Sequence, residues 1–391
     1  MTFSHKEFEE RIARLQALLQ KREIGWAALF DDVSMLYYAG TIQGGALVVP
    51  QKGEARLFLR RSAQRGAQES WLKEQIVPIR SFRKVAQTID CDGPVGIVKG
   101  KTTAAHLDLF LKYFDESLPV VDITNDTTIL RARKSAAEIE ILREAGRRQA
   151  TVFAQVPDFL YPGETEWTVG SKMRAAALLQ GDPGLVRLSV SSSTFTAGVV
   201  CYGDSSLSPG AFDGPCNGVG FSPAWPIVGS SRQFKENEHA LVDFVFGYEG
   251  YFVDRTRIFY QGQLDERLQR AMDSCLKIQQ EVVSRLRPGA VPAQIYDEIL
   301  AYVEEIGESE GFMGLGDNRV SFVGHGIGMV VDEFPVIAPK FEMLLEPGMV
   351  LAIEPKIAVP ELGMVGVENT WLITDGEAEK LTPGSDEPIA L

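Results

Sequence analysis

Along the first 125 residues, segments with the hydrophobic spacing of a helix alternate with short apolar runs typical of strands. Apolar side chains recur every three or four residues from Phe8 to Leu19, which predicts an amphipathic helix over residues 5–21. Short apolar runs predict strands at residues 26–30, 46–49, 55–59 and 95–98. With a further helix expected near residues 103–113, this alternation predicts a small α/β domain at the start of the chain.

A polar segment marks the end of that domain. Residues 124–134 have little apolar character and are predicted to be a linker. Ser135 and Glu138 then have the spacing of a capping box ahead of a long helix. The resulting prediction is an N-terminal domain, a linker and a C-terminal domain, over residues 1–125, 126–134 and 135–391.

The C-terminal domain repeats one pattern weakly. A Leu-x-Pro-Gly phrase separates two predicted helices at residues 160–163 and again at 286–289. Each helix pair is later followed by a predicted hairpin that carries two carboxylates, which suggests two similar halves. Between them lies a Gly-, Pro- and Ser-rich stretch, residues 203–231, and long loops of this kind often border a functional site.

The first predicted hairpin places two aspartates close together. Asp243 ends one apolar run, Asp254 follows the next, and a turn near residues 247–250 joins them. A turn centred between residues 248 and 249 puts Asp243 directly opposite Asp254. Opposed side chains in a sheet have Cβ atoms roughly 4.5–5.5 Å apart.

The second predicted hairpin places two glutamates close together. Glu354 and Glu368 flank the turn sequence of residues 360–363, and a turn centred on residue 361 places them opposite each other. Carboxylates this close repel unless cations lie between them. His325, between two glycines that permit close backbone approach, completes a set of oxygen ligands with one imidazole. This set suits manganese, iron, cobalt or zinc.

Composition narrows the classes of protein. The chain has 391 residues, a formal net charge of −14 and no long run of Lys or Arg, so a nucleic-acid partner is not expected. No window is apolar enough to span a membrane, and the N-terminus does not have the pattern of a signal peptide. Four scattered cysteines without CxxC spacing favour free thiols in the cytoplasm.

The ordered set Asp243, Asp254, His325, Glu354 and Glu368, together with the phrases DRTRIF, GHGIG and GMVLAIEP, resembles the pita-bread metallohydrolases. That family includes methionine aminopeptidase, aminopeptidase P, prolidase and creatinase, and residues 1–125 resemble the N-terminal domain of the prolidase and creatinase branch. The resemblance implies an α/β fold with a C-terminal pita-bread domain of α+β type and a smaller creatinase-like N-terminal domain. It also implies a homodimer.

The activity that the resemblance implies is hydrolysis of a small peptide substrate, as by an Xaa-Pro aminopeptidase or dipeptidase. The five residues would hold two divalent ions (Mn, Co or Zn), and a metal-bridging hydroxide would attack the scissile amide. Glu354, besides being a ligand, would transfer the proton of the water to the leaving nitrogen. Thr256 is expected either to hydrogen-bond a metal-bound carboxylate or water, or to be an ordinary strand threonine.

The chain departs from the family pattern around the substrate. No His lies in residues 222–226, where the peptidases have one, and Asp332 replaces a second His. Gly366 stands where prolidases often carry Arg. We expect Asp332 to bind a substrate amine, and Trp225 and Phe212 of the long loop to line the pocket. The departures leave two alternatives open: a hydrolase of a non-peptide C–N bond, as creatinase is, or a non-catalytic binding protein.

Overall fold

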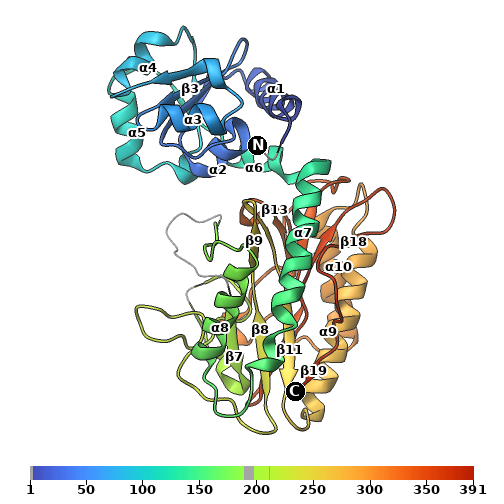
Figure 1. The fold of residues 1–391 in the computed structure, drawn as a ribbon. Coiled ribbons are helices and arrows are strands. Elements are labelled where there is room, and N and C mark those ends of the chain that lie inside the picture. The colour runs from blue at the N-terminus through green and yellow to red at the C-terminus, as the bar shows by residue number, and fades with distance from the viewer. Residues whose placement is uncertain (1–2, 189–197, 211) are drawn as a thin grey trace. The chain divides into compact units, whose positions relative to one another are not determined.

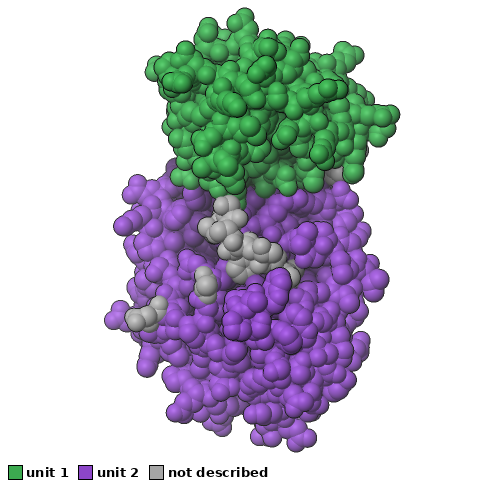
Figure 2. Space-filling model, turned by 90° about the vertical axis from the view of Figure 1, so that its left-hand side faces the viewer, with its two compact units in different colours: residues 1–131, 190–192 green, residues 132–189, 193–391 purple. Residues whose placement is uncertain are grey.

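The computed structural model describes residues 3–188, 198–210 and 212–391 (Figure 1). The described residues up to Arg131 form one compact unit, and those from Ala132 onward form a second (Figure 2). The expected α/β class is confirmed in both units.

The first unit is built on a six-stranded sheet with the order β4-β3-β2-β1-β5-β6. Neighbouring pairs from β1 to β3 are antiparallel, while β3–β4, β1–β5 and β5–β6 are parallel. Trp26, Phe82 and Phe110 anchor the apolar core on one side of this sheet. The strands are β1 Trp26–Leu29, β2 Gly45–Pro50, β3 Arg56–Leu59, β4 Ile76–Pro78, β5 Val95–Ile97 and β6 Val120–Asp122. The helices are α1 His5–Lys21, α2 Asp32–Ser34, α3 Ala63–Glu69, α4 Arg83–Thr88, α5 Ala104–Leu111 and α6 Thr124–Ala132.

Most of the predicted linker, residues 126–134, lies in helix α6, and the boundary between the two units falls within it. Two of its polar side chains, Thr127 and Arg131, lie one helical turn apart on a buried face. The hydroxyl of Thr127 donates to the carbonyl of Thr124 at 2.9 Å, which satisfies it inside the helix. A helix whose buried face is polar gives no hydrophobic periodicity, so the pattern misses it.

The first half of the second unit begins with α7 Ala136–Phe153, whose predicted capping box between Ser135 and Glu138 is present. Helix α8 Glu166–Leu179 follows. A four-stranded sheet has the order β19-β11-β8-β7, and the small hairpin β9–β10 extends from it. The strands are β7 Val199–Tyr202, β8 His239–Asp243, β9 Phe246–Tyr248, β10 Tyr251–Val253, β11 Thr256–Tyr260 and β19 Ile389–Ala390.

The second half repeats this plan with α9 Glu266–Arg285 and α10 Pro292–Glu305, followed by a five-stranded sheet of order β13-β12-β14-β17-β18 and a hairpin β15–β16. Helices α7, α9 and α10 run along the outside of the strands (Figure 1). The strands are β12 Gly324–Ile327, β13 Val331–Ile337, β14 Val350–Ile353, β15 Lys356–Val359, β16 Gly363–Gly366, β17 Asn369–Leu372 and β18 Glu379–Lys380. No described helix is long and apolar enough to cross a membrane.

Candidate metal centre

The register of the first hairpin differs from the prediction by one residue at its turn. Glu249 and Gly250 both have positive φ, so the turn is centred between them rather than between residues 248 and 249. Asp243 therefore lies opposite Thr256 in the β8–β11 pair, and not opposite Asp254. Asp254 occupies the break between β10 and β11, where its backbone N–H donates to Thr370 Oγ1 at 2.8 Å.

The register of the second hairpin is as predicted. Ile353 pairs with Asn369, and Lys356 pairs with Gly366. Both pairs are symmetric about residue 361, so Glu354 and Glu368 lie at corresponding positions on the two sides of the hairpin. His325 reaches the same place from β12, which pairs with β14.

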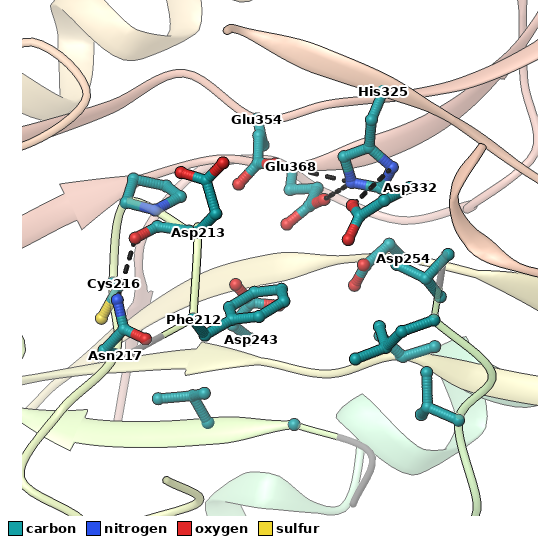
Figure 3. A pocket seen from close by; sticks show the side chains of 18 of the residues that line it. Phe212, Asp213, Cys216, Asn217, Asp243, Asp254, His325, Asp332, Glu354 and Glu368 are labelled. Carbon is teal, nitrogen blue, oxygen red and sulfur yellow. Dashed lines mark hydrogen bonds and ion pairs between the residues drawn. The ribbon is translucent and has the colours of Figure 1, made fainter. Parts of the chain in front are cut away.

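The five predicted residues converge on one pocket, where their side chains point toward one another (Figure 3). Their ligand atoms form two groups, each with all atoms within 4.8 Å of one another. The Asp254 group consists of Asp254, His325 and Glu368, and the Asp243 group consists of Asp243, Glu354 and Glu368. Glu368 belongs to both groups and therefore couples them.

Burial makes this concentration of negative charge unfavourable without cations. Burial raises the pKa of Asp243 to about 6, although Lys356 opposes the shift. The pKa of Asp254 is raised well above its ordinary value by burial and by the carboxylates of Glu368 and Asp243. Burial also raises the pKa of Glu368. The cluster thus favours either protons or bound cations.

Burial acts on the pKa of His325 in the opposite direction from its effect on the carboxylates. Burial alone would lower its pKa, but the neighbouring carboxylates of Asp332, Glu354 and Glu368 raise it overall. Its Nε2 lies 3.5 Å from Glu354 Oε1 and 3.9 Å from Glu368 Oε1. Its Nδ1 lies 3.1 Å from the carbonyl of Gly326, an arrangement that leaves Nε2 directed at the carboxylates.

Lys356 is a member of the site that the sequence reasoning missed. Its ammonium lies 2.6 Å from Glu354 Oε2, 3.2 Å from Glu368 Oε2 and 3.3 Å from Asp243 Oδ2, with none of its side chain exposed. Burial lowers its pKa, but these carboxylates together raise it well above the ordinary value. The signal was in the sequence, because Lys356 follows Glu354 by two residues and begins an otherwise apolar strand.

The predicted contact of Thr256 with a carboxylate of the cluster is present. Its hydroxyl donates to Glu368 Oε2 at 2.8 Å, and the side chain is fully buried. The guanidinium of Arg257 donates to the backbone carbonyl of Glu368 at 2.9 Å and to Asn369 Oδ1 at 2.9 Å. These bonds fix both the side chain and the backbone of the shared glutamate.

The two residues predicted to contact substrate have different outcomes. Asp332 lines the pocket, has a left-handed backbone conformation (φ +64°), and places Oδ1 3.5 Å from His325 Nδ1. Trp225 is not among the residues that line this pocket, which corrects its predicted placement. It closes a tight turn with Ser222, and 51% of its surface is exposed. Phe212 of the same loop lines the pocket as predicted, and Asp213 beside it lines the pocket as well (Figure 3).

The two groups differ in how well they fit a divalent ion. The Asp254 group offers two carboxylates and one imidazole, a donor set typical of zinc, manganese or cobalt sites. In the Asp243 group, the ammonium of Lys356 already contacts all three carboxylates. The residues of the Asp254 group therefore fit a divalent ion. Those of the Asp243 group do not, because Lys356 already occupies the position between them.

A buried cluster of carboxylates and imidazole, carried by paired hairpins at the base of a pocket, defines a metal-dependent hydrolase. Residues 140–375 match the model of metallopeptidase family M24, and residues 11–133 match the creatinase/prolidase N-terminal domain. The chain belongs to metallopeptidase family M24, whose members use divalent metal ions, and it is a peptidase of that family.

Two of the following similar proteins span nearly the whole chain. The Xaa-Pro dipeptidase of Pyrococcus furiosus is 23% identical over 377 residues, covering 96% of this chain and 98% of that protein. An uncharacterized peptidase of Bacillus subtilis is 29% identical over 276 residues, covering 70% of this chain and 68% of that protein. The structure of an Xaa-Pro dipeptidase from Bacillus anthracis superposes with a TM-score of 0.83 at 23% identity, covering 98% of this chain and all of that one.

Proposed function

We propose that this protein is a metal-dependent peptidase that cleaves the bond before proline at the amino terminus of short peptides. The observation that carries the proposal is the convergence of Asp254, His325, Glu354 and Glu368 on one pocket. The Xaa-Pro dipeptidases among the relatives support the preference for proline.

The Asp254 group would hold a divalent ion, which when bound supplies Lewis-acid polarisation of a carbonyl and lowers the pKa of water. Thr256 and Arg257 hold Glu368 in place for this role. The metal identity, manganese, cobalt or zinc, remains a prediction. The second ion expected from the family pattern would have to displace the ammonium of Lys356 from the Asp243 group.

Glu354 is proposed as the catalytic acid and base. Its Oε2 is held by Lys356 at 2.6 Å, while Oε1 faces His325 at 3.5 Å and the side chain lines the pocket. A carboxylate fixed at one oxygen leaves the other to accept the proton of the attacking water. The same oxygen would then donate that proton to the leaving nitrogen.

The charge of the pocket favours recognition of the peptide's amino terminus. Asp332 and Asp213 are both among its lining residues, and either carboxylate would attract an α-ammonium group. Among the described residues that line this pocket, none is Lys or Arg, so the lining offers no cation for the carboxylate of a dipeptide. The proposal therefore favours an aminopeptidase acting on tripeptides and longer chains over a dipeptidase.

Hydrolysis of matched Xaa-Pro dipeptides and Xaa-Pro-Xaa tripeptides tests this function. Purified protein is stripped with a chelator, reloaded with Mn²⁺, Co²⁺ or Zn²⁺ and compared with Glu354→Gln. Metal-dependent cleavage that is lost in the variant and prefers tripeptides is the expected result. Absence of cleavage by metal-loaded protein would overturn the peptidase proposal and favour a non-peptide C–N bond as substrate.

The remaining expectations concern the cellular form of the protein. A homodimer is proposed from the prolidase-like branch and is tested by light scattering of the eluted full-length chain. A cytoplasmic location is proposed from the four cysteines, all of which are free. Fractionation of the source cells tests it.

A further inference from the structure

The ammonium of Lys356 lies where the family pattern requires a second metal ion. Its Nζ contacts one oxygen of each carboxylate in the Asp243 group, at 2.6, 3.2 and 3.3 Å. A lysine ammonium has three N–H donors and no acceptor, so three carboxylates match its hydrogen-bonding capacity. Since none of the side chain is exposed, the ammonium has no access to water as an alternative partner.

From this arrangement we infer that Lys356 is a built-in cation that replaces one metal ion, so that the chain binds a single divalent ion in the Asp254 group. The inference rests on the proposed metal-dependent function and changes its metal stoichiometry from two to one.

Steric and electrostatic arguments both exclude an ion beside the ammonium. A divalent ion in the Asp243 group would lie about 2.0–2.2 Å from each carboxylate oxygen. The oxygens of this group are all within 4.8 Å of one another, and Nζ already lies among them. An ion at their centre would be in contact with a positive charge that shares the same three ligands.

The charge balance is consistent with one ion. The four carboxylates carry four negative charges, against which Lys356 supplies one positive charge and a single divalent ion supplies two, so a net charge of −1 remains. A second divalent ion would make the cluster net positive, in a protein whose overall formal charge is −14. Lys356 therefore supplies in the Asp243 group the compensation that a metal ion would otherwise provide.

The strand opposite Lys356 is shaped to admit its side chain. Gly366 is its cross-strand partner, and a Cβ at position 366 would lie 2.4 Å from Lys356 Cγ. The backbone carbonyl of Lys356 accepts from the N–H of Met313 at 2.8 Å, which fixes the strand from its other edge. The stem of Lys356 thus packs over the backbone of Gly366, in space that a side chain at position 366 would occupy.

Metal counting tests the inference without reference to any substrate. Full-length protein is stripped with a chelator, equilibrated with excess Mn²⁺, freed of unbound metal by gel filtration and analysed by mass spectrometry for metal per chain. We expect one ion in the wild type and two in Lys356→Met, which keeps the length of the side chain and removes its charge. Lys380→Met is the matched control, because Lys380 pairs with Asp386 outside the cluster, and it should keep one ion.

A wild-type count of two or of zero would overturn the inference, and so would a variant Lys356→Met that still binds one. If that variant does not fold, electron paramagnetic resonance of the Mn²⁺-loaded wild type decides. The spectrum of an isolated Mn²⁺ supports the inference, and that of an exchange-coupled pair overturns it. One bound ion without peptide cleavage would leave the inference standing and reject only the proposed peptidase function.

Discussion

Gly366 lies directly across the β15–β16 hairpin from Lys356, and the absence of a side chain at one position is what permits the long side chain at the other. Besides Lys356 Cγ at 2.4 Å, a Cβ on Gly366 would meet the carbonyl oxygen of Pro355 at 2.9 Å. Both distances are shorter than ordinary van der Waals contacts, so position 366 and the lysine are structurally coupled.

Gly366→Ala should destabilise the protein by about 1–3 kcal/mol, because the new methyl group forces the lysine stem to move. The same substitution made in Lys356→Ala should cost less, since Cγ is then missing. Urea unfolding of the wild type, both single variants and the double variant gives the coupling free energy, which we expect to exceed about 0.5 kcal/mol. Additive free energies would show that the two positions do not interact.

Thr256→Val should weaken metal binding by about 10- to 100-fold, because the hydroxyl that orients Glu368 is lost while the volume is kept. Thr256→Ser keeps the donor and should retain affinity close to that of the wild type. Isothermal titration of the chelator-treated proteins with Zn²⁺ measures both. Equal losses in the two variants would mean that packing by the methyl group, and not the hydrogen bond, supports the site.

Asp332→His should change substrate preference, because it replaces a pocket carboxylate that faces His325 with a residue able to carry positive charge. We expect KM for peptides with a free amino terminus to rise by about 10-fold, while N-acetylated peptides are affected less. The exposed variant Asp375→His is the control. An unchanged ratio of KM for free and acetylated peptides would rule out contact between Asp332 and the substrate amine.

His239 should make the protein sensitive to mild acid. Burial lowers its pKa to about 4, and its Nε2 lies 3.0 Å from the carbonyl of Met364. The unfolded chain binds the proton with a pKa of about 6.5, so this contribution to stability is complete above that pH and is lost as pH falls toward 4. The loss should be on the order of 2–3 kcal/mol.

The acid effect of His239 is measured by urea unfolding between pH 4.5 and 8. His239→Gln retains a donor for the carbonyl of Met364 but does not titrate, so its stability should fall less steeply below pH 6.5 than that of the wild type. The carboxylate cluster titrates in both proteins and cancels in the comparison. Parallel curves would contradict a role for His239.

The elements and the site were largely predictable because hydrophobic periodicity, the capping box at Ser135 and the symmetric turn at Glu361 are local signals. The first hairpin was misplaced by one residue because glycines at both ends of the segment 247–250 are compatible with more than one turn centre, and only the positive φ of Glu249 and Gly250 places the centre between them. Helix α6 was missed because its buried face is polar. Such features depend on tertiary contacts that composition does not reveal.

Lys356 was not predicted as a member of the site. A single lysine at the start of a strand is usually solvated, so its spacing from Glu354 was passed over, and the structure shows its ammonium enclosed by three carboxylates. Trp225 shows the converse error. Of the two loop aromatics assigned to the pocket, Phe212 lines it, whereas the tight turn with Ser222 turns Trp225 toward solvent.

A cation that is part of the polypeptide cannot be diluted, chelated or exchanged for another element. The ammonium of Lys356 is held among its carboxylates at a fixed effective concentration, whereas a dissociable ion is present only in proportion to its supply. The neutralisation of the Asp243 group therefore does not depend on the concentration of metal ions around the protein. Scarcity of metal would empty the Asp254 group while leaving the Asp243 group neutralised and in place.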